Sequence, residues 1–196
     1  MNRRVIFLTW FRVLPLAVVL LFGVISYVYS FGPSLLFKAW YPLEHEEKIT
    51  EAASKYGVDP YLVAAIIRTE SGWDSEAESE RGALGLMQLM PETAQDIVVK
   101  GYIDGTVYSA DNLRDPETNI EFGCAYLSFL LSYFNGATDK AIAAYNAGMG
   151  NVETWTQEGD ALHKVIAFPE TQAYLVRVNM AQSRYRELYP EAFASM

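Results

Sequence analysis

The sequence predicts a mainly α-helical protein in which a single transmembrane helix precedes one globular domain. The 196 residues are enough for one hydrophobic core and too few for two full domains with separate cores. Apolar residues recur at helical spacing, and no segment alternates with period two for long enough to indicate a strand. Near the N-terminus, 25 consecutive uncharged residues run from Val13 to Phe37. These observations predict an N-terminal anchor followed by a helical domain.

The uncharged run predicts a membrane anchor. Its densest part, residues 13–31, is long enough to cross a hydrocarbon core of roughly 30 Å. Three arginines lie in residues 1–12, whereas all 24 acidic residues lie at or beyond Glu44. The positive-inside rule therefore predicts a short cytoplasmic N-terminus and a single-pass protein of the cell membrane, with its domain on the extracytoplasmic side. A cleaved signal peptide and a buried helical hairpin are the alternatives, although no convincing small-x-small cleavage site follows the run.

Beyond the anchor, start and stop signals predict the helices. Residues 32–43, punctuated by glycine and proline, predict a juxtamembrane linker, and residues 44–196 predict one domain. Asp59-Pro60 and Asp115-Pro116 each place an acid before a proline, the pattern of a helix N-terminus. Gly57 ends an apolar stripe and predicts a helix C-terminus. A last stripe at helical spacing comprises Tyr174, Val178, Ala181, Tyr185 and Leu188.

Composition excludes two classes of function. With 15 basic and 24 acidic residues the chain carries a formal charge of -9, and the domain has no basic stripe to neutralise phosphates, so a nucleic-acid partner is not expected. Cys124 is the single cysteine, and the histidines are His45 and His163 alone. No cluster has metal-ligand spacing, so the sequence predicts no metal site and no cofactor.

Glu70 is the candidate catalytic residue. Val63, Ile66 and Ile67 form the apolar face of the predicted helix that begins at Pro60, and Glu70 lies on that face in the last turn. Burial and the helix dipole both favour the protonated carboxyl there, as a general acid near neutral pH requires. The alternative is a solvated glutamate at a fraying helix end.

The chain resembles the soluble-lytic-transglycosylase family of peptidoglycan-cleaving enzymes, over roughly Ile49 to Tyr185. The motifs that carry the resemblance are Glu70-Ser71, the run Gly82 to Gln88 with Met90-Pro91 and Thr93-Ala94, the positions Asn119, Gly123, Tyr126 and Leu127, the run Ala144 to Gly148, and Pro169-Glu170-Thr171 with Tyr174. Each motif is weak alone, but their order and spacing together are specific. One departure is Trp73, where the family often has Phe.

The resemblance implies a helical, lysozyme-like domain with a groove for a glycan strand. It makes Glu70 the sole catalytic acid and base in cleavage of the β-1,4 bond between MurNAc and GlcNAc. Glu70 is then expected to protonate the leaving oxygen and afterwards to take the proton of the C6 hydroxyl, which attacks C1 of the same sugar and leaves a 1,6-anhydromuramoyl end. A nucleophile tethered to the substrate makes a second carboxylate unnecessary.

The resemblance also implies six substrate-binding residues, four of which have a simpler structural alternative. They are Ser79, Met87, Gln88, Tyr145, Asn146 and Tyr174. The alternatives are a turn serine, a core methionine, a capping asparagine and, for Tyr174, simple packing in its apolar stripe. Glu170 is either a structural acid or a contact to the stem peptide.

Two other functions stay open. A lysozyme-type hydrolase on the same fold needs a second acid opposite Glu70, and the loop supplies Asp74, Glu76, Glu78 and Glu80 as candidates, although a polar loop favours solvated acids. A non-catalytic, membrane-tethered glycan-binding scaffold belongs to a different class, and the presence of Glu70 beside the family motifs argues against it. The expected partners are therefore peptidoglycan strands and, through the anchor, the membrane.

Overall fold

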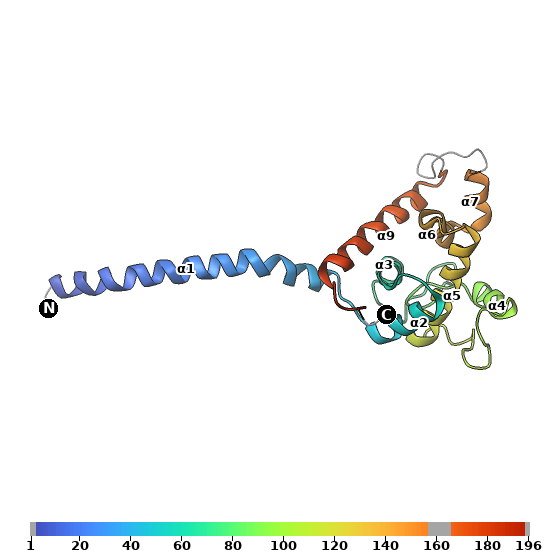
Figure 1. Ribbon diagram of the computed structural model, residues 1–196, viewed down its shortest axis with the longest axis horizontal. Coiled ribbons are helices and arrows are strands. Elements are labelled where there is room, and N and C mark those ends of the chain that lie inside the picture. The colour runs from blue at the N-terminus through green and yellow to red at the C-terminus, as the bar shows by residue number, and fades with distance from the viewer. Residues whose placement is uncertain (1–2, 157–165, 195–196) are drawn as a thin grey trace. The chain divides into compact units, whose positions relative to one another are not determined.

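The computed structural model describes residues 3–156 and 166–194, except for the side chains of 3–12 and 29–35, and His163 lies outside these ranges. It divides the chain into two compact units, Met1–Pro42 and Leu43–Met196. The helices are α1 (Arg3–Trp40), α2 (Glu46–Tyr56), α3 (Pro60–Glu70), α4 (Pro91–Val99), α5 (Pro116–Tyr133), α6 (Thr138–Ala147), α7 (Met149–Thr156) and α9 (Pro169–Leu188) (Figure 1). Within the described residues the structure contains isolated bridges but no strand, so the predicted mainly helical fold is confirmed.

The first unit is essentially the one helix α1, whose residues from Val13 to Val28 are exposed and mostly apolar. The helix continues to Trp40, through Gly32 and Pro33, where the glycine and proline predicted a linker. A single proline removes one backbone donor and weakens a helix without always ending it. Over the described residues, no helix combines the length and apolarity needed to cross a membrane. The predicted span 13–31 ends among residues whose side chains are not described.

Three helix boundaries of the second unit lie where the local signals predicted. Asp59 caps α3, its side chain accepting a hydrogen bond from the Tyr61 amide at 3.1 Å, and Asp115 caps α5 in the same way through the Thr118 amide at 2.8 Å. Gly57 ends α2 in the left-handed region, with φ 64°, which a glycine adopts without steric cost. These predicted caps are confirmed.

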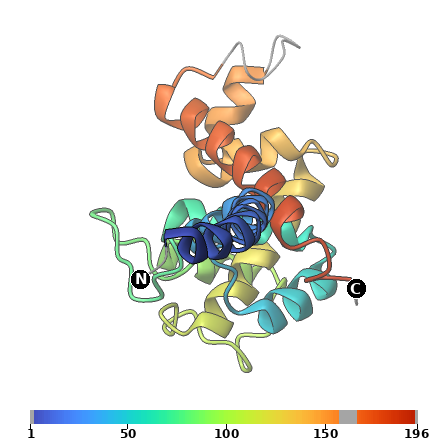
Figure 2. The same cartoon turned by 90° about the vertical axis from the view of Figure 1, so that its left-hand side faces the viewer.

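Helix α3 is the centre of the domain. Its residues from Leu62 to Ile67 are at most 2% exposed. It packs most extensively against α9 and also against α2, while α5 lies between α2 and α6. In Figures 1 and 2, α6 and α7 gather beside the start of α9, in agreement with the packing of these elements. Burying each Leu, Val or Ile side chain of α3 contributes about 1.5–3 kcal/mol, so the turns of α3 that precede Glu70 are anchored in the core.

Candidate active site

Glu70 is the last residue of α3 and is partly buried. Burial raises the pKa of its carboxyl from an ordinary 4.5 to about 7, because desolvation disfavours the charged form. The Tyr174 hydroxyl and the nearby charge of Arg177 oppose this rise, since both stabilise the carboxylate. The carboxyl therefore exchanges its proton near neutral pH, as an acid and base catalyst requires.

Tyr174 is the direct partner of Glu70. It comes from the first turns of α9, is 2% exposed, and donates a hydrogen bond of 2.7 Å from its hydroxyl to Glu70 Oε1. A buried phenol in this position orients the carboxyl and leaves the second oxygen, Oε2, for other chemistry. Burial and the neighbouring Glu70 raise the pKa of Tyr174, so the phenol stays protonated and acts as a donor.

Tyr145 connects this pair to the loop that follows α3. It lies at the end of α6, and its hydroxyl donates to the backbone carbonyl of Met87 at 2.9 Å. Its ring packs against Tyr126 of α5 with a centroid distance of 5.3 Å. Burial raises the pKa of Tyr145, and the nearby Glu70 raises it further. The charge of Glu70 therefore acts on Tyr145, and the expected role of Tyr145 in substrate binding stays a prediction.

The loop from Ser71 to Met90 is ordered by its own hydrogen bonds. Gln88 has a left-handed backbone with φ 48°, and its side-chain amide donates to the carbonyls of Ala77 and Gly85, each at 3.0 Å. The Ser79 hydroxyl accepts from the Ala83 amide at 3.0 Å, while the Ser79 amide donates to the Ala83 carbonyl. Ser79 thus has the contacts of a turn serine, and the structure does not bring it to Glu70 by any described contact.

Met87 and Asn146, two of the expected substrate-binding residues, both have partners within the protein. The Met87 side chain is 0% exposed and packs on Gly123, where a Cβ would lie 2.1 Å from its sulfur, which is the environment of a core methionine. Asn146 is exposed and accepts a hydrogen bond of 2.9 Å from Thr171, a buried residue at the start of α9. Asn146 therefore joins the ends of α6 and α9. Glu170 is exposed, one residue before Thr171.

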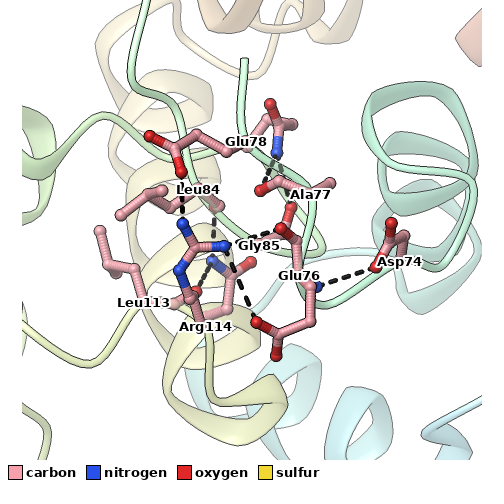
Figure 3. Close-up of polar contacts among 10 residues, drawn as sticks. Asp74, Glu76, Ala77, Glu78, Leu84, Gly85, Leu113 and Arg114 are labelled. Carbon is pink, nitrogen blue, oxygen red and sulfur yellow. Dashed lines mark hydrogen bonds and ion pairs between the residues drawn. The ribbon is translucent and has the colours of Figure 1, made fainter.

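Three of the four loop acids contact partners other than Glu70. Arg114, just before α5, donates to the Glu76 carbonyl at 2.7 Å and to the Glu78 carboxylate at 2.5 Å (Figure 3). Asp74 accepts from the Glu76 amide at 2.9 Å, and Glu80 is exposed. Trp73 is buried, and its indole donates to the Tyr185 hydroxyl at 2.9 Å, so the larger aromatic at this position packs in the interior.

Three residues with site contacts were not identified as such from the sequence. Arg177 and Thr171 lie on α9, and only the tertiary fold brings them to Glu70 and Asn146. Asn119 is fully buried and accepts a hydrogen bond from the loop backbone at Met87. The sequence contained a signal for this role, since Asn119 is an amide among the apolar positions of a buried helix. Within residues 3–156 and 166–194, no three His, Cys, Asp or Glu side chains gather as metal ligands would.

The fold and the site together define a class: a helical domain of the lysozyme-like kind that places one buried, tyrosine-bonded carboxyl at the end of its central helix. Comparison with known proteins identifies the family within this class. Residues 47–167 match the model of the transglycosylase SLT domain, and the chain belongs to that family.

Relatives and solved structures agree with this assignment. The soluble lytic murein transglycosylase of Escherichia coli K12 is 37% identical over 152 residues, which cover 74% of this chain and 23% of the relative. The 70 kDa soluble lytic transglycosylase of Escherichia coli superposes with a TM-score of 0.73 at 33% identity, over 82% of this chain and 27% of that one. An inactive mutant of the lytic transglycosylase of Pseudomonas aeruginosa superposes with a TM-score of 0.71 at 35% identity, over 76% and 25%. The chain thus spans about a quarter of the length of these relatives.

Proposed function

We propose that this protein is a peptidoglycan lytic transglycosylase, which cleaves the β-1,4 bond between MurNAc and GlcNAc and leaves a 1,6-anhydromuramoyl end. The observation that carries the proposal is the carboxyl of Glu70, partly buried, with its pKa raised to about 7 and one oxygen bonded to Tyr174. Membership of the SLT family supplies the substrate class.

The reaction needs the Glu70 carboxyl in both of its protonation states. In the first step the protonated carboxyl gives its proton to the glycosidic oxygen, and the bond from that oxygen to C1 of MurNAc breaks. In the second step the carboxylate takes the proton of the C6 hydroxyl while O6 bonds to C1. The proton returns to Glu70, GlcNAc leaves with a free hydroxyl, and no water is consumed.

Tyr174 supports both steps. Its hydroxyl donates to Oε1 at 2.7 Å and so leaves Oε2 for the proton that moves. The hydrogen bond lowers the pKa of Glu70, whereas burial raises it, and the balance near 7 lets one group act as acid and then as base.

Among the residues that the structure describes, the loop acids Asp74, Glu76 and Glu78 contact partners other than Glu70, and this favours the proposed reaction over hydrolysis. Glu76 and Glu78 face Arg114, and Asp74 bonds within its own turn, so these three loop acids are committed elsewhere. A hydrolase of this architecture requires a carboxylate across the scissile bond to activate or replace water. Attack by the C6 hydroxyl of the same sugar needs no second carboxylate.

The relatives supply further support. The lytic transglycosylase of Pseudomonas aeruginosa was solved as an inactive mutant in which a glutamine replaces one glutamate. A 70-kDa soluble lytic transglycosylase was solved as a complex with bulgecin A, and it covers 77% of this chain at 34% identity. Dependence on one glutamate is what a mechanism with a single acid and base predicts.

The substitution Glu70→Gln tests the proposal. The amide keeps the size of the side chain but cannot donate a proton, so turnover of purified glycan strands should fall by at least about 10²- to 10⁴-fold. Binding of the strands and the circular dichroism spectrum should stay close to those of the parent. Glu80→Gln, which removes an exposed acid from the neighbouring loop, is the matched control. Near-parental turnover by folded Glu70→Gln protein would remove Glu70 from the reaction.

We further propose that α1 anchors the domain in the cell membrane, with the domain on the extracytoplasmic side. The support is the exposed apolar surface from Val13 to Val28, together with the arginines before it and the acids beyond Glu44. A tag placed before Arg3 should resist added protease in intact cells, whereas a tag after Met196 should be cleaved once any outer barrier is opened. A soluble mature form that begins near Ser30 would contradict the anchor.

A further inference from the structure

The backbone of Met87 is held on both sides by side chains from two helices. Its amide donates to Asn119 Oδ1 of α5 at 2.7 Å. Its carbonyl accepts from the Tyr145 hydroxyl of α6 at 2.9 Å. Met87 precedes Gln88, so these bonds fix the backbone immediately before a residue that the family motif places in substrate binding.

Asn119 ties the loop to its surroundings with its whole amide group. Besides accepting from Met87, it donates from Nδ2 to the Leu84 carbonyl at 2.9 Å and to the Leu113 carbonyl at 2.7 Å. It is 0% exposed. All three bonds go to loop backbone, and none satisfies the helix that carries Asn119. A buried amide that serves only loop backbone has a positional role there.

The loop lies directly on this amide. A Cβ at Gly85 would lie 2.4 Å from Asn119 Nδ2 and 2.2 Å from the Leu113 carbonyl, and the glycine has φ 75°, so only glycine fits here. Figure 3 shows Leu84 and Gly85 lying beside Leu113. Three residues on, Gln88 has φ 48°, which residues other than glycine rarely adopt. The orientation of Gln88 therefore depends on how Gly85 to Met87 is held.

We propose that Asn119 is a positioning residue for the reaction: it holds the segment Gly85–Gln88 in the one arrangement that presents Gln88 to the glycan strand and Met87 to Tyr145. The inference rests on the proposed function for the identity of the ligand. Asn119 itself touches no substrate. It acts through the loop backbone, and its removal leaves the bond between Glu70 and Tyr174 in place.

Kinetics on purified glycan strands test the proposal, with the full-length chain and its Asn119→Ala variant. We expect kcat/KM to fall by about 10- to 100-fold, as for a misplaced substrate contact, with the larger change in KM. The pH profile should stay where it is in the parent, because the surroundings of Glu70 are unchanged. Gly85→Ala displaces the loop from Asn119 while Asn119 itself is intact, so it should give the same kinetic pattern. If Asn119→Ala does not fold, Gly85→Ala provides the test.

Ile49→Ala is the matched control, because it empties a fully buried site in α2, a helix that takes no part in the hydrogen bonds of the Asn119 side chain. At a temperature where every variant is folded by circular dichroism, it should keep kcat/KM within about twofold of the parent, although it melts earlier. A purely structural role for Asn119 predicts that its variant behaves like the control. Parental kcat/KM in folded Asn119→Ala and Gly85→Ala proteins would overturn the proposal, and so would a shifted pH profile.

Hydrogen exchange at the Met87 amide separates this proposal from the proposed function. Exchange should become faster in Asn119→Ala and remain slow in Ile49→Ala, whatever reaction the protein catalyses. Faster exchange in a chain whose parent releases no anhydro sugar would uphold the loop contact and reject the transglycosylase assignment. Unchanged exchange at Met87 would reject the positioning role while leaving that assignment intact.

Discussion

Glu70→Gln should stabilise the protein at alkaline pH, because the native state holds an acid at a site that disfavours its charge. The perturbation replaces the carboxyl with a neutral amide of equal size that still accepts from Tyr174. The pKa of Glu70 is about 7 in the folded protein against 4.5 ordinarily, and this difference corresponds to about 3 kcal/mol as an upper figure for a partly exposed group.

The sign follows from proton binding. Between the two pKa values the folded protein binds more protons at Glu70 than the unfolded chain, so the free energy of unfolding falls as pH rises through this window and is constant above it. The Glu70→Gln variant has no ionisable group at this position, so its free energy of unfolding does not fall for this reason. Relative to the parent it should therefore gain up to about 3 kcal/mol between about pH 4 and pH 8.

Urea unfolding followed by circular dichroism at several pH values measures this difference. Glu80→Gln controls for the loss of one negative charge from the domain, because Glu80 is exposed. The two curves of stability against pH, for the parent and for Glu70→Gln, should diverge as pH rises. Parallel curves would show that the carboxyl of Glu70 is not perturbed by burial, and the assignment of its role as a neutral-pH acid would lose its physical basis.

Two further predictions concern the same site. Tyr174→Phe removes a hydrogen-bond donor that lowers the pKa of Glu70. A hydrogen bond to a charged group is worth about 1.5–3 kcal/mol, so the profile of kcat/KM against pH should move to higher pH by about one unit. An unmoved profile would contradict the contact between Tyr174 and Glu70. Asp74→Asn and Glu78→Gln should each keep most of the activity in a chromatographic assay of released muropeptides, because Asp74 contacts its own turn and Glu78 contacts Arg114. A loss as large as that of Glu70→Gln would reveal a second essential acid.

The sequence predicted the parts of the fold that local chemistry decides. Asp59 and Asp115 cap helices whose first residue is proline, and Gly57 supplies the left-handed residue that ends α2. The burial of Glu70 also followed from its place on an apolar helix face. By contrast, α1 continues through Gly32 and Pro33, because one proline weakens a helix without always ending it.

The arrangement of the site depends on contacts between distant segments, which spacing does not reveal. Tyr174 lies 104 residues after Glu70, and its apolar stripe predicted burial but not the direction of its hydroxyl. The family motif predicted Met87 as a substrate-binding residue, but it did not reveal that the methionine side chain fills the space left by Gly123. Asn119 was visible as a motif residue, but its role follows only from the loop backbone that surrounds it.

Digestion of peptidoglycan in ¹⁸O-labelled water tests the central claim most directly, because it asks whether water enters the product. If the C6 hydroxyl of MurNAc is the nucleophile and Glu70 is the only acid and base, mass spectrometry of the released sugars should find 1,6-anhydro ends without label at C1. Reducing ends that carry the label would show that water attacks C1, and would make the protein a hydrolase with a second catalytic carboxylate.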